Sequence, residues 1–541
     1  MIALYNQRKW TFLSYLIALV MMIPVLIMLV DGIDASTQLF GHLWQTVLPD
    51  YLQNTILLGV FVVLLSLIFG VVSAALISQT NLLFKQQLRW LLLLPLAMPA
   101  YLVAYLYTDL FDYAGPVQRN LRLWFDWQSP TEYWFFDLRT LSGAAVMLAL
   151  VLYPYIYMLT RGAFEQQDQS LMRAARLLGL NAKQTFFNVA LPLARPAIAV
   201  SASLVLMETL ADFATVQYFS VNTLTTAIFD TWLGYGDMAA ANALASVLML
   251  LVLCVIVVEQ RGRAGLRHQS SRPNMHKELI QLSFLQQIAA SVFCWLLVIL
   301  GFLLPFALLI SMAVEYSNAE QLANLLETGI NSIKVSVIAA TVAVFIALIL
   351  GFYQRLHGNK FSHLPQQISG FGYAIPGTVL AMAMLATFAP LDHWLNDIAE
   401  FFAWQQPGLI MSGTIFAMIF AFVVRFSAIA NGTIASGIKQ IPQSLDYAPA
   451  TLGMGLIKTV TRVHLPILKP TILIAWLLVF VESMKELSAV LLLRPFNFET
   501  LSSQIYQLIS DEMLEQGALG AILIVLFGLL PIILLNRKRE H

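Results

Sequence analysis

The stretch EQQDQSLMRAARLLGLNAKQTFFNVALPLARP, residues 165–196, and its counterpart IASGIKQIPQSLDYAPATLGMGLIKTVTRVHLPILKP, residues 434–470, interrupt a chain that is otherwise strongly apolar. In the first stretch apolar side chains recur at helical spacing, at Leu171, Ala174, Ala175 and Leu178. This pattern predicts a short helix with one apolar face, and Gly179 then supplies a turn before a second short helix. Both stretches are too polar to cross a membrane.

Around these stretches the composition indicates a membrane protein. Hydrophobic residues make up 59% of the 541 residues and charged residues only 11%, whereas soluble domains have about 25% charged residues. Runs of about 20 apolar residues, long enough to cross the bilayer, lie near 11–31, 51–78, 89–111, 140–160, 196–219, 239–258, 288–314, 331–353, 367–390, 408–428, 470–493 and 516–535. The predicted fold is an all-α integral membrane protein with twelve transmembrane helices, the first one retained rather than cleaved as a signal peptide.

The distribution of charge predicts the topology. With the N-terminus in the cytoplasm, most of the 30 Lys and Arg residues fall in inner connections, and the outer ones receive Arg119, Arg122, Arg139 and Arg494. Because inner loops of membrane proteins are enriched in Lys and Arg, both termini are predicted to be cytoplasmic. The predicted localisation is the bacterial inner membrane, as a multi-pass protein.

The two halves of the chain are related in sequence. At an offset of about 274–277 residues, Pro99 matches Pro376, and the series Gly179, Leu191, Pro192, Glu208 matches Gly453, Leu465, Pro466, Glu482. We therefore predict two parallel six-helix repeats, residues 1–259 and 288–541, joined by a basic cytoplasmic linker over 260–287. The inner loops between the fourth and fifth spans are assigned to residues 161–195 and 429–469.

These inner loops resemble the coupling motif of binding-protein-dependent ABC importer permeases. An Ala-Ala pair, a glycine four residues later and a downstream Leu-Pro carry the resemblance, on Ala174, Ala175, Gly179, Leu191 and Pro192, and again on Ala448, Gly453, Leu465 and Pro466. The resemblance implies that short helices in both loops sit in grooves of ATPase subunits. The second copy departs from the motif, because Tyr447 stands at its acidic position and Pro449 at its second alanine, so its docking helix is expected to be shorter or reset.

The resemblance also implies the partners. We expect two copies of a cytoplasmic ABC ATPase, a periplasmic solute-binding protein and membrane lipid, with no nucleic acid. The chain has no phosphate-binding G-x-x-x-x-G-K-[ST] loop and no hydrolase or zinc motif. It is therefore predicted to be a translocation subunit and not an enzyme, with no catalytic residues, metal site or bound cofactor, while ATP and Mg²⁺ are used by the partner.

Acidic residues fall inside both predicted fifth spans. Ionisable groups at such depths either line a cavity or pair with one another, and both interpretations stay open for Glu208, Asp212, Glu482, Lys485 and Glu486. The members of each acidic pair are four apart, which predicts that they share a helix face. Arg425 and Lys334 are expected to reach toward the membrane surface from span ends.

Within the family, the sequences from Met207 and from Val481 onward resemble fused permeases for ferric iron. This implies an importer that moves ferric iron delivered by a binding protein, by alternating access. Permeases of the same architecture for thiamine, polyamines, phosphonates or sulfate remain alternatives. The rivals from other classes are an ion-gradient-driven secondary transporter, in which the acidic residues would carry protons, and a membrane scaffold that recruits a partner without transport.

Overall fold

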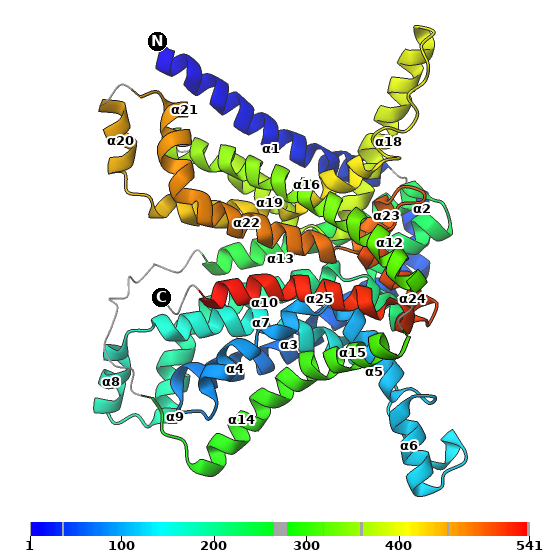
Figure 1. The fold of residues 1–541 in the computed structure, drawn as a ribbon, viewed down its shortest axis with the longest axis vertical. Coiled ribbons are helices and arrows are strands. Elements are labelled where there is room, and N and C mark those ends of the chain that lie inside the picture. The colour runs from blue at the N-terminus through cyan, green and yellow to red at the C-terminus, as the bar shows by residue number, and fades with distance from the viewer. Residues whose placement is uncertain are drawn as a thin grey trace. The chain divides into compact units, whose positions relative to one another are not determined.

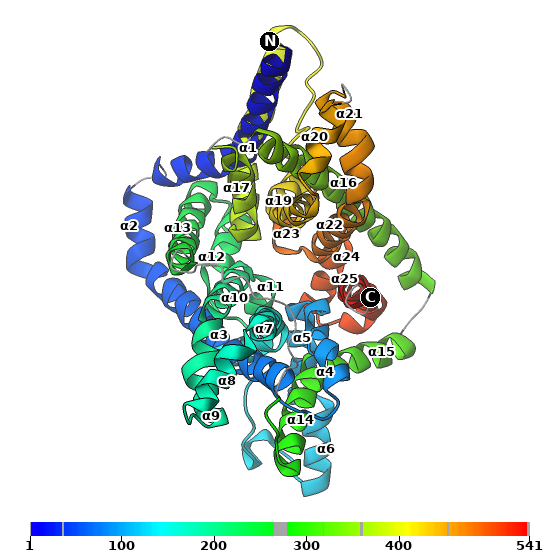
Figure 2. The ribbon, with the colours of Figure 1, turned by 90° about the vertical axis from the view of Figure 1, so that its left-hand side faces the viewer.

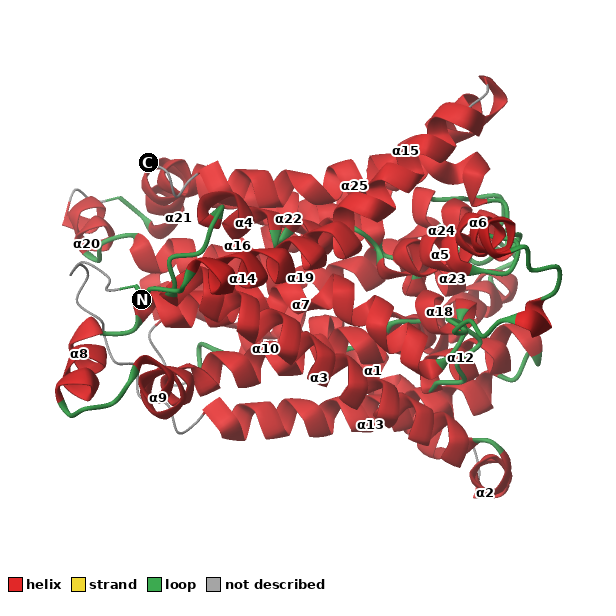
Figure 3. Cartoon of the chain, turned by 90° about the horizontal axis from the view of Figure 1, so that it is seen from below, coloured by secondary structure: helices red, strands yellow, loops and turns green. Residues whose placement is uncertain are grey.

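The computed structural model describes residues 2–34, 37–263, 279–316, 319–357, 361–451 and 454–537. Helices dominate these ranges, and no strand occurs in them (Figure 3). The β-type contact that they contain is an isolated parallel bridge between Thr80 and Ile280. The all-α fold class predicted from composition and periodicity is confirmed.

The candidate membrane spans agree with the predicted ones. Eleven helices of the described chain are long and apolar enough to cross a membrane, or twelve if one bent pair forms a single span. That pair, Lys85–Ala97 and Ala100–Phe125, covers the predicted third span and bends by 92°. The break has a local cause, because Pro99 has an extended backbone and directly precedes the second helix, where a proline ring is tolerated.

Packing divides the chain into two compact units that are not contiguous in sequence. One unit comprises Met1–Gly41, Ile228–Met249 and Leu322–Gln504, and the other comprises His42–Ala227, Leu250–Gln321 and Ile505–His541. The first helix of the chain therefore packs with the second predicted repeat, and the helices that follow the linker pack with the first. The repeat boundaries at 259 and 288 stay predictions about sequence duplication.

The unit that contains most of the second repeat is built around α19, beside which α17, α22 and α23 lie (Figure 2). Its helices are α1 (Ile2–Asp34), α16 (Ala319–His357), α17 (Leu364–Gly370), α18 (Gly377–Phe401), α19 (Ile415–Gln440), α20 (Ser444–Thr451), α21 (Leu456–Thr459), α22 (Leu465–Lys485) and α23 (Ser488–Leu493). The short helices α20 and α21 follow the end of α19 and precede α22 (Figure 1).

The other unit is built on the packing of α3 and α10 against α7. Its helices are α3 (Leu48–Gln79), α4 (Lys85–Leu91), α5 (Ala100–Phe111), α6 (Pro116–Phe125), α7 (Leu141–Gln166), α8 (Gln169–Leu177), α9 (Ala182–Thr185), α10 (Leu191–Ala211), α11 (Ala214–Tyr218), α14 (Phe284–Val298), α15 (Leu304–Tyr316) and α25 (Leu514–Arg537). The first residues of α16 also fall in this unit, and four further helices are divided between the units: α2 (Thr37–Thr46), α12 (Leu224–Phe229), α13 (Met238–Arg263) and α24 (Leu501–Ser510).

Local irregularities recur in both repeats at the predicted offset. A 3-10 turn at Leu94–Ala97 corresponds to one at Phe371–Ala374, and Pro376 precedes α18 as Pro99 precedes α5. A π-helical turn at Phe186–Ala190 likewise corresponds to one at Val460–His464. Similar sequences have thus produced the same departures from ideal helix, which supports the duplication.

Candidate functional site

The first inner loop consists of two short helices, as its sequence predicts. Asp168 caps α8 by accepting a 2.8 Å hydrogen bond from the backbone N–H of Ser170, and this donation lowers the pKa of the Asp168 carboxyl. Asn181 caps α9 through a reciprocal pair of bonds with Gln184. Such caps satisfy N–H groups that a helix start leaves without partners. Both helices are therefore defined by their own sequence.

Gly179 ends α8 in the left-handed conformation, with φ of +88°. The N–H of Leu180 donates to the carbonyl of Ala175 at 3.1 Å, which closes the helix end. No atom lies within 4 Å of the place where a Cβ would stand, so backbone conformation rather than space favours glycine here. The turn predicted at Gly179 is confirmed, and Leu191 and Pro192 follow it as the first residues of α10.

One part of the apolar face of α8 packs inside the protein, and the other part is exposed. Ala175 is buried within the chain, whereas Leu171, Ala174 and Leu178 are exposed at helical spacing. Leu178 is 85% exposed, which is unusual for a large apolar side chain on a polar loop. The exposed residues form a stripe of the kind that an amphipathic helix presents to a protein groove.

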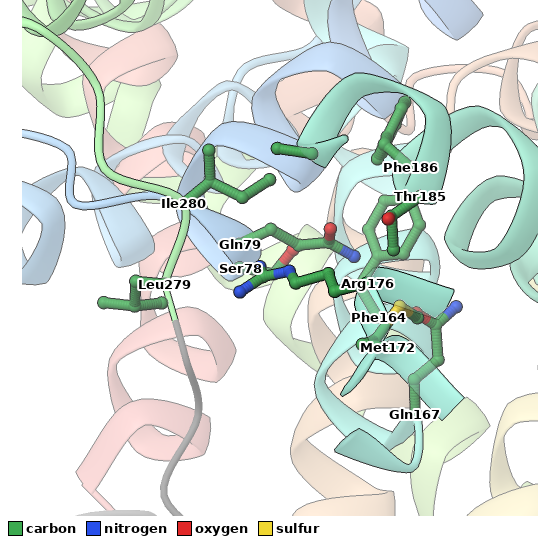
Figure 4. A pocket seen from close by; sticks show the side chains of 11 residues that line it. Ser78, Gln79, Phe164, Gln167, Met172, Arg176, Thr185, Phe186, Leu279 and Ile280 are labelled. Atoms are coloured by element: carbon green, nitrogen blue, oxygen red, sulfur yellow. The ribbon is translucent and has the colours of Figure 1, made fainter. Parts of the chain in front are cut away.

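A small cavity lies beneath the first loop (Figure 4). Its volume is about 30 Å³, enough for a water molecule. It is lined by Ser78, Gln79, Phe164, Gln167, Met172, Arg176, Ala182, Thr185, Phe186, Leu279 and Ile280. Ile280 belongs to the predicted linker, and its N–H donates to the carbonyl of Gln79 at 2.8 Å. The described end of the linker is therefore bound against α3, next to the loop.

The second inner loop has the same order of elements. Its helix α20 continues through Pro449 to Thr451 and has eight residues, against nine in α8, so the expected shortening is confined to one residue. Leu465 and Pro466 begin α22, as their counterparts begin α10. Ala448 lies in α20, while Gly453 lies outside the described residues.

A charged cluster that the sequence did not reveal holds α20 in place. Arg355 at the end of α16 contacts Asp446 of α20 at 2.9 Å and donates to the carbonyls of Ile438 and Ile441, where α19 ends. His464 Nε2 lies 3.0 Å from the other Asp446 oxygen. Because the last carbonyls of a helix have no partner within it, one guanidinium joins α16, α19 and α20. The available signal was Asp446 itself, one residue before the acidic position of the motif.

The first repeat places its arginine cluster outside the loop helix. Arg161 of α7 donates to the carbonyl of Arg89 at 2.8 Å, and Arg89 pairs with Glu165 at 3.0 Å. These contacts tie the inner end of α7 to α4.

The fifth spans begin and end earlier in the sequence than predicted. They were expected to continue to residues 219 and 493, but α10 ends at Ala211 and α22 at Lys485, and the next residues, Asp212 and Glu486, have extended backbones. Glu208 and Asp212 consequently do not share one continuous helix face, and neither do Glu482 and Glu486. The physical reason is that each second carboxylate caps the short helix that follows, which local hydrogen bonding favours over continued helix.

The capping contacts correspond between the repeats. Asp212 Oδ1 accepts from the N–H of Thr215 at 3.1 Å, and Glu486 Oε1 accepts from the N–H of Ala489 at 3.1 Å. Lys485 lies 3.9 Å from Glu482, as its spacing predicts. These contacts make Asp212 and Glu486 part of a polar network; whether the acidic residues also line a translocation path stays a prediction.

Arg425 is not near a span end, contrary to the expectation from sequence. It lies in the middle of α19, is 8% exposed, and its Nη1 atom is 3.3 Å from Glu486 Oε1. The close approach requires Gly377, because a Cβ there would lie 2.5 Å from Arg425 Nη1 and 2.6 Å from Glu486 Oε1. A buried charge needs such a partner, so pairing has replaced the expected extension toward the surface.

Hydroxyl groups tie each helix break to neighbouring segments in the same way. Thr225 donates to the carbonyl of Asp212 at 2.8 Å, as Ser502 does to that of Glu486. The N–H of Leu224 donates to Thr55 at 3.0 Å, and its counterpart is the 2.7 Å bond from Leu501 to Ser332. Thr55 and Ser332 stand at the same position of the two repeats, 277 residues apart, so the correspondence between the repeats extends to these contacts.

Comparison with known proteins identifies the family. A family model described as "Binding-protein-dependent transport system inner membrane component" matches residues 66–259 and again residues 343–537. The chain belongs to this family. Each match falls within one predicted repeat, so the chain is a double-length member of a family of transport permease subunits. Members of this family are inner-membrane proteins, consistent with the many apolar helices of this chain.

Several curated relatives share long stretches of sequence. The Fe(3+)-transport system permease protein FbpB 2 of Haemophilus influenzae is 25% identical over 540 residues, which covers 97% of each chain. The ferric transport system permease protein FbpB of Actinobacillus pleuropneumoniae is 24% identical over 91% of this chain and 71% of its own. The molybdenum transport system permease protein ModB of Escherichia coli is 29% identical over 41% of this chain and 96% of its own.

Proposed function

We propose that this permease moves ferric iron across the inner membrane in an ATP-driven importer. The observation that carries the proposal is the similarity to an Fe(3+)-transport permease over 97% of both chains. A single shared domain would support only the family, whereas similarity through both repeats and the connections between them also covers the segments that would surround a substrate.

The proposed partners follow from the two loops. Two copies of an ATPase subunit would each hold one inner loop, the first through the exposed stripe of Leu171, Ala174 and Leu178. A binding protein loaded with iron would dock on the outer surface, with both termini of this chain in the cytoplasm. ATP and Mg²⁺ would be bound and used by the ATPase, and this chain would carry out no catalysis and hold no cofactor of its own.

The mechanism is mechanical. Closure of the ATPase dimer would move the loops around Gly179 and Gly453, and the permease would then open to one side of the membrane at a time. Glu208, Asp212, Glu482, Lys485 and Glu486 are proposed to contribute polar groups along the path. Asp212 and Glu486 would do so while remaining the caps of the short helices after each break.

Uptake of radioactive ferric iron tests the proposal. Cells that lack this gene should take up little iron and regain uptake when the gene is restored, provided that the ATPase is active. Uptake that persists with an inactivated ATPase would favour a gradient-driven carrier instead. Failure to transport iron in either case would overturn the substrate, and molybdate, phosphonate, sulfate, thiamine and polyamine uptake would then be measured in the same strains.

A further inference from the structure

Aromatic side chains are displayed at the tip of the hairpin formed by residues 112–140. Its helix α6 ends in Leu123, Trp124 and Phe125, and the first two of these are 73% and 79% exposed. A monomeric protein rarely leaves a contiguous group of large apolar side chains in water. The tip therefore indicates contact with an apolar or interfacial environment.

Side-chain contacts hold the hairpin together, so the exposure of its tip is not the result of a lack of packing around it. Tyr133 donates to Gln118 Oε1 at 2.5 Å, and Arg122 donates to the Tyr133 hydroxyl at 3.0 Å. Trp127 stacks on Tyr133 with ring centroids 4.7 Å apart. Phe125 joins this stack through Trp127, with ring centroids 4.8 Å apart, while Leu123 and Trp124 stay largely exposed.

The second repeat has a corresponding tip at residues 401–404, in the connection formed by residues 391–414. Phe401 and Trp404 are 84% and 66% exposed. The N–H of Trp404 bonds to the carbonyl of Ala399 at 2.7 Å, and the N–H of Trp127 bonds to that of Arg122 at 3.0 Å, so both helices end in the same way. Asp126 and Ala403, at equivalent positions, both have φ near +55°: 56° and 54° respectively.

The direction of α6 indicates that the tip lies at the membrane surface. Figure 1 shows that α6, which follows α5, runs across the direction of α3 and α7 in its own unit, and Figure 2 shows the same when α7 is seen end-on. Because α3 and α7 are candidate membrane spans, a helix that crosses their direction at one end lies along the membrane surface. Figure 1 also shows the outer end of α18 diverging from α16 and α22 of its unit.

We propose that the tips at residues 123–125 and 401–404 insert among the lipid head groups of the outer leaflet and anchor the two hairpins there. Trp favours the boundary between water and hydrocarbon, and Phe and Leu accompany it on the apolar faces of helices that lie at that boundary. A lipid surface also presents the same chemistry to both repeats, whereas a single binding protein would meet them with different parts of its surface. The candidate spans likewise expose large apolar side chains, such as Phe345, which a bilayer would cover.

Site-directed spin labelling tests the anchor in the whole protein. The exposed natural thiol is removed by Cys254→Ser, while Cys294 is buried and should not react. Nitroxide labels are attached to Trp124→Cys and Phe401→Cys, with Leu123→Cys as a replacement if Trp124→Cys does not fold. The protein is placed in bilayers of phosphatidylethanolamine and phosphatidylglycerol, and collision rates with oxygen and with a water-soluble nickel complex are compared.

Two labelled positions calibrate the measurement. Phe345→Cys on the long helix α16 reports lipid, and Asp511→Cys on an exposed outer connection reports water. If the tips are anchored in lipid, the ratio of the collision rate with oxygen to that with the nickel complex should be several-fold higher for labels at 124 and 401 than for the label at 511. Ratios equal to that of position 511 at both tips would overturn the anchor, and protection of the tips by added binding protein would then assign them to protein docking. The result does not depend on which substrate is transported.

Discussion

The two inner loops have the same backbone plan and are held by different side chains. In the second, Arg355, Asp446 and His464 bind α20 to its surroundings. At the offsets of the repeat, these positions are Ser78, Met172 and Ala190 in the first, where Ser78 and Met172 line a cavity closed by the end of the linker. The duplication thus preserved the order of the short helices and changed the contacts that hold the first of them.

The helix breaks differ in a similar way. Glu486 is paired with Arg425 beside Gly377. At the offset of 277 the first repeat has Leu148 and Ala100 in place of Arg425 and Gly377. Asp212 instead accepts hydrogen bonds from Thr215 and from the N–H of Val216. A buried ion pair costs desolvation and depends on both partners. We conclude that the second repeat should be more sensitive than the first to loss of a single charge.

The largest effect is expected at the helix break of the second repeat. Arg425→Leu places there the residue type of the first repeat and leaves Glu486 buried without its guanidinium. The expected loss of stability is about 3–5 kcal/mol, measured by thermal unfolding in detergent. Adding Glu486→Gln should restore much of it, and Lys334→Leu, at an exposed position, should change little. If Arg425→Leu and the double variant Arg425→Leu/Glu486→Gln lose the same stability, the pairing of Arg425 with Glu486 is contradicted.

The second largest loss of stability is expected from breaking the contacts of Arg355 that hold α20. Arg355→Gln removes the contacts to Asp446 and to the end of α19, and should cost about 3 kcal/mol because the pair is largely buried. We expect substrate uptake to fall with it. The matched change in the first repeat, Ser78→Ala, removes one bond within its own helix and should cost about 1 kcal/mol or less. Similar losses from the two variants would show that the loops are held alike.

Gly179→Ala addresses the turn that ends α8 in the first loop. A left-handed alanine costs about 1–2 kcal/mol, so the variant should stay in the membrane while ATP hydrolysis becomes uncoupled from uptake. Two controls separate coupling from strain. Gly162 has an ordinary helical backbone with free space around it, so Gly162→Ala should cause no strain. Gly236 has a positive φ outside the inner loops, so Gly236→Ala should cause strain without affecting coupling. Normal coupled uptake by Gly179→Ala would remove the turn from the mechanism.

The smallest effect concerns the cap of α8. Because hydrogen bonds from Ser170 lower the pKa of Asp168, its contribution to stability is present above the ordinary pKa of 3.8 and is lost as the pH falls through the lower folded value. The stability difference between wild type and Asp168→Asn should therefore be small and constant from pH 5 to pH 8. A difference that titrates near neutral pH would assign another role to Asp168.

Positions of helices and turns could be predicted from sequence because their causes are local. Apolar length gave the spans, and Gly179, Pro99 and Pro376 marked turns and breaks that the structure contains. The breaks at Asp212 and Glu486 were missed because both lie within apolar surroundings that continue beyond them. What ends each helix there is a capping bond, and a hydropathy pattern does not register such a bond.

Hydropathy, the repeat offset and the coupling motif are features of short stretches of sequence, and they were sufficient to predict a membrane-spanning permease with two repeats. Which charges meet depends on the folding of the whole chain. Arg425 with Glu486 is a contact over 61 positions, and Arg355 with Asp446 one over 91. The tertiary structure also decided that the compact units exchange segments between the repeats. These outcomes depend on which buried groups can satisfy one another in space, and no local pattern contains that information.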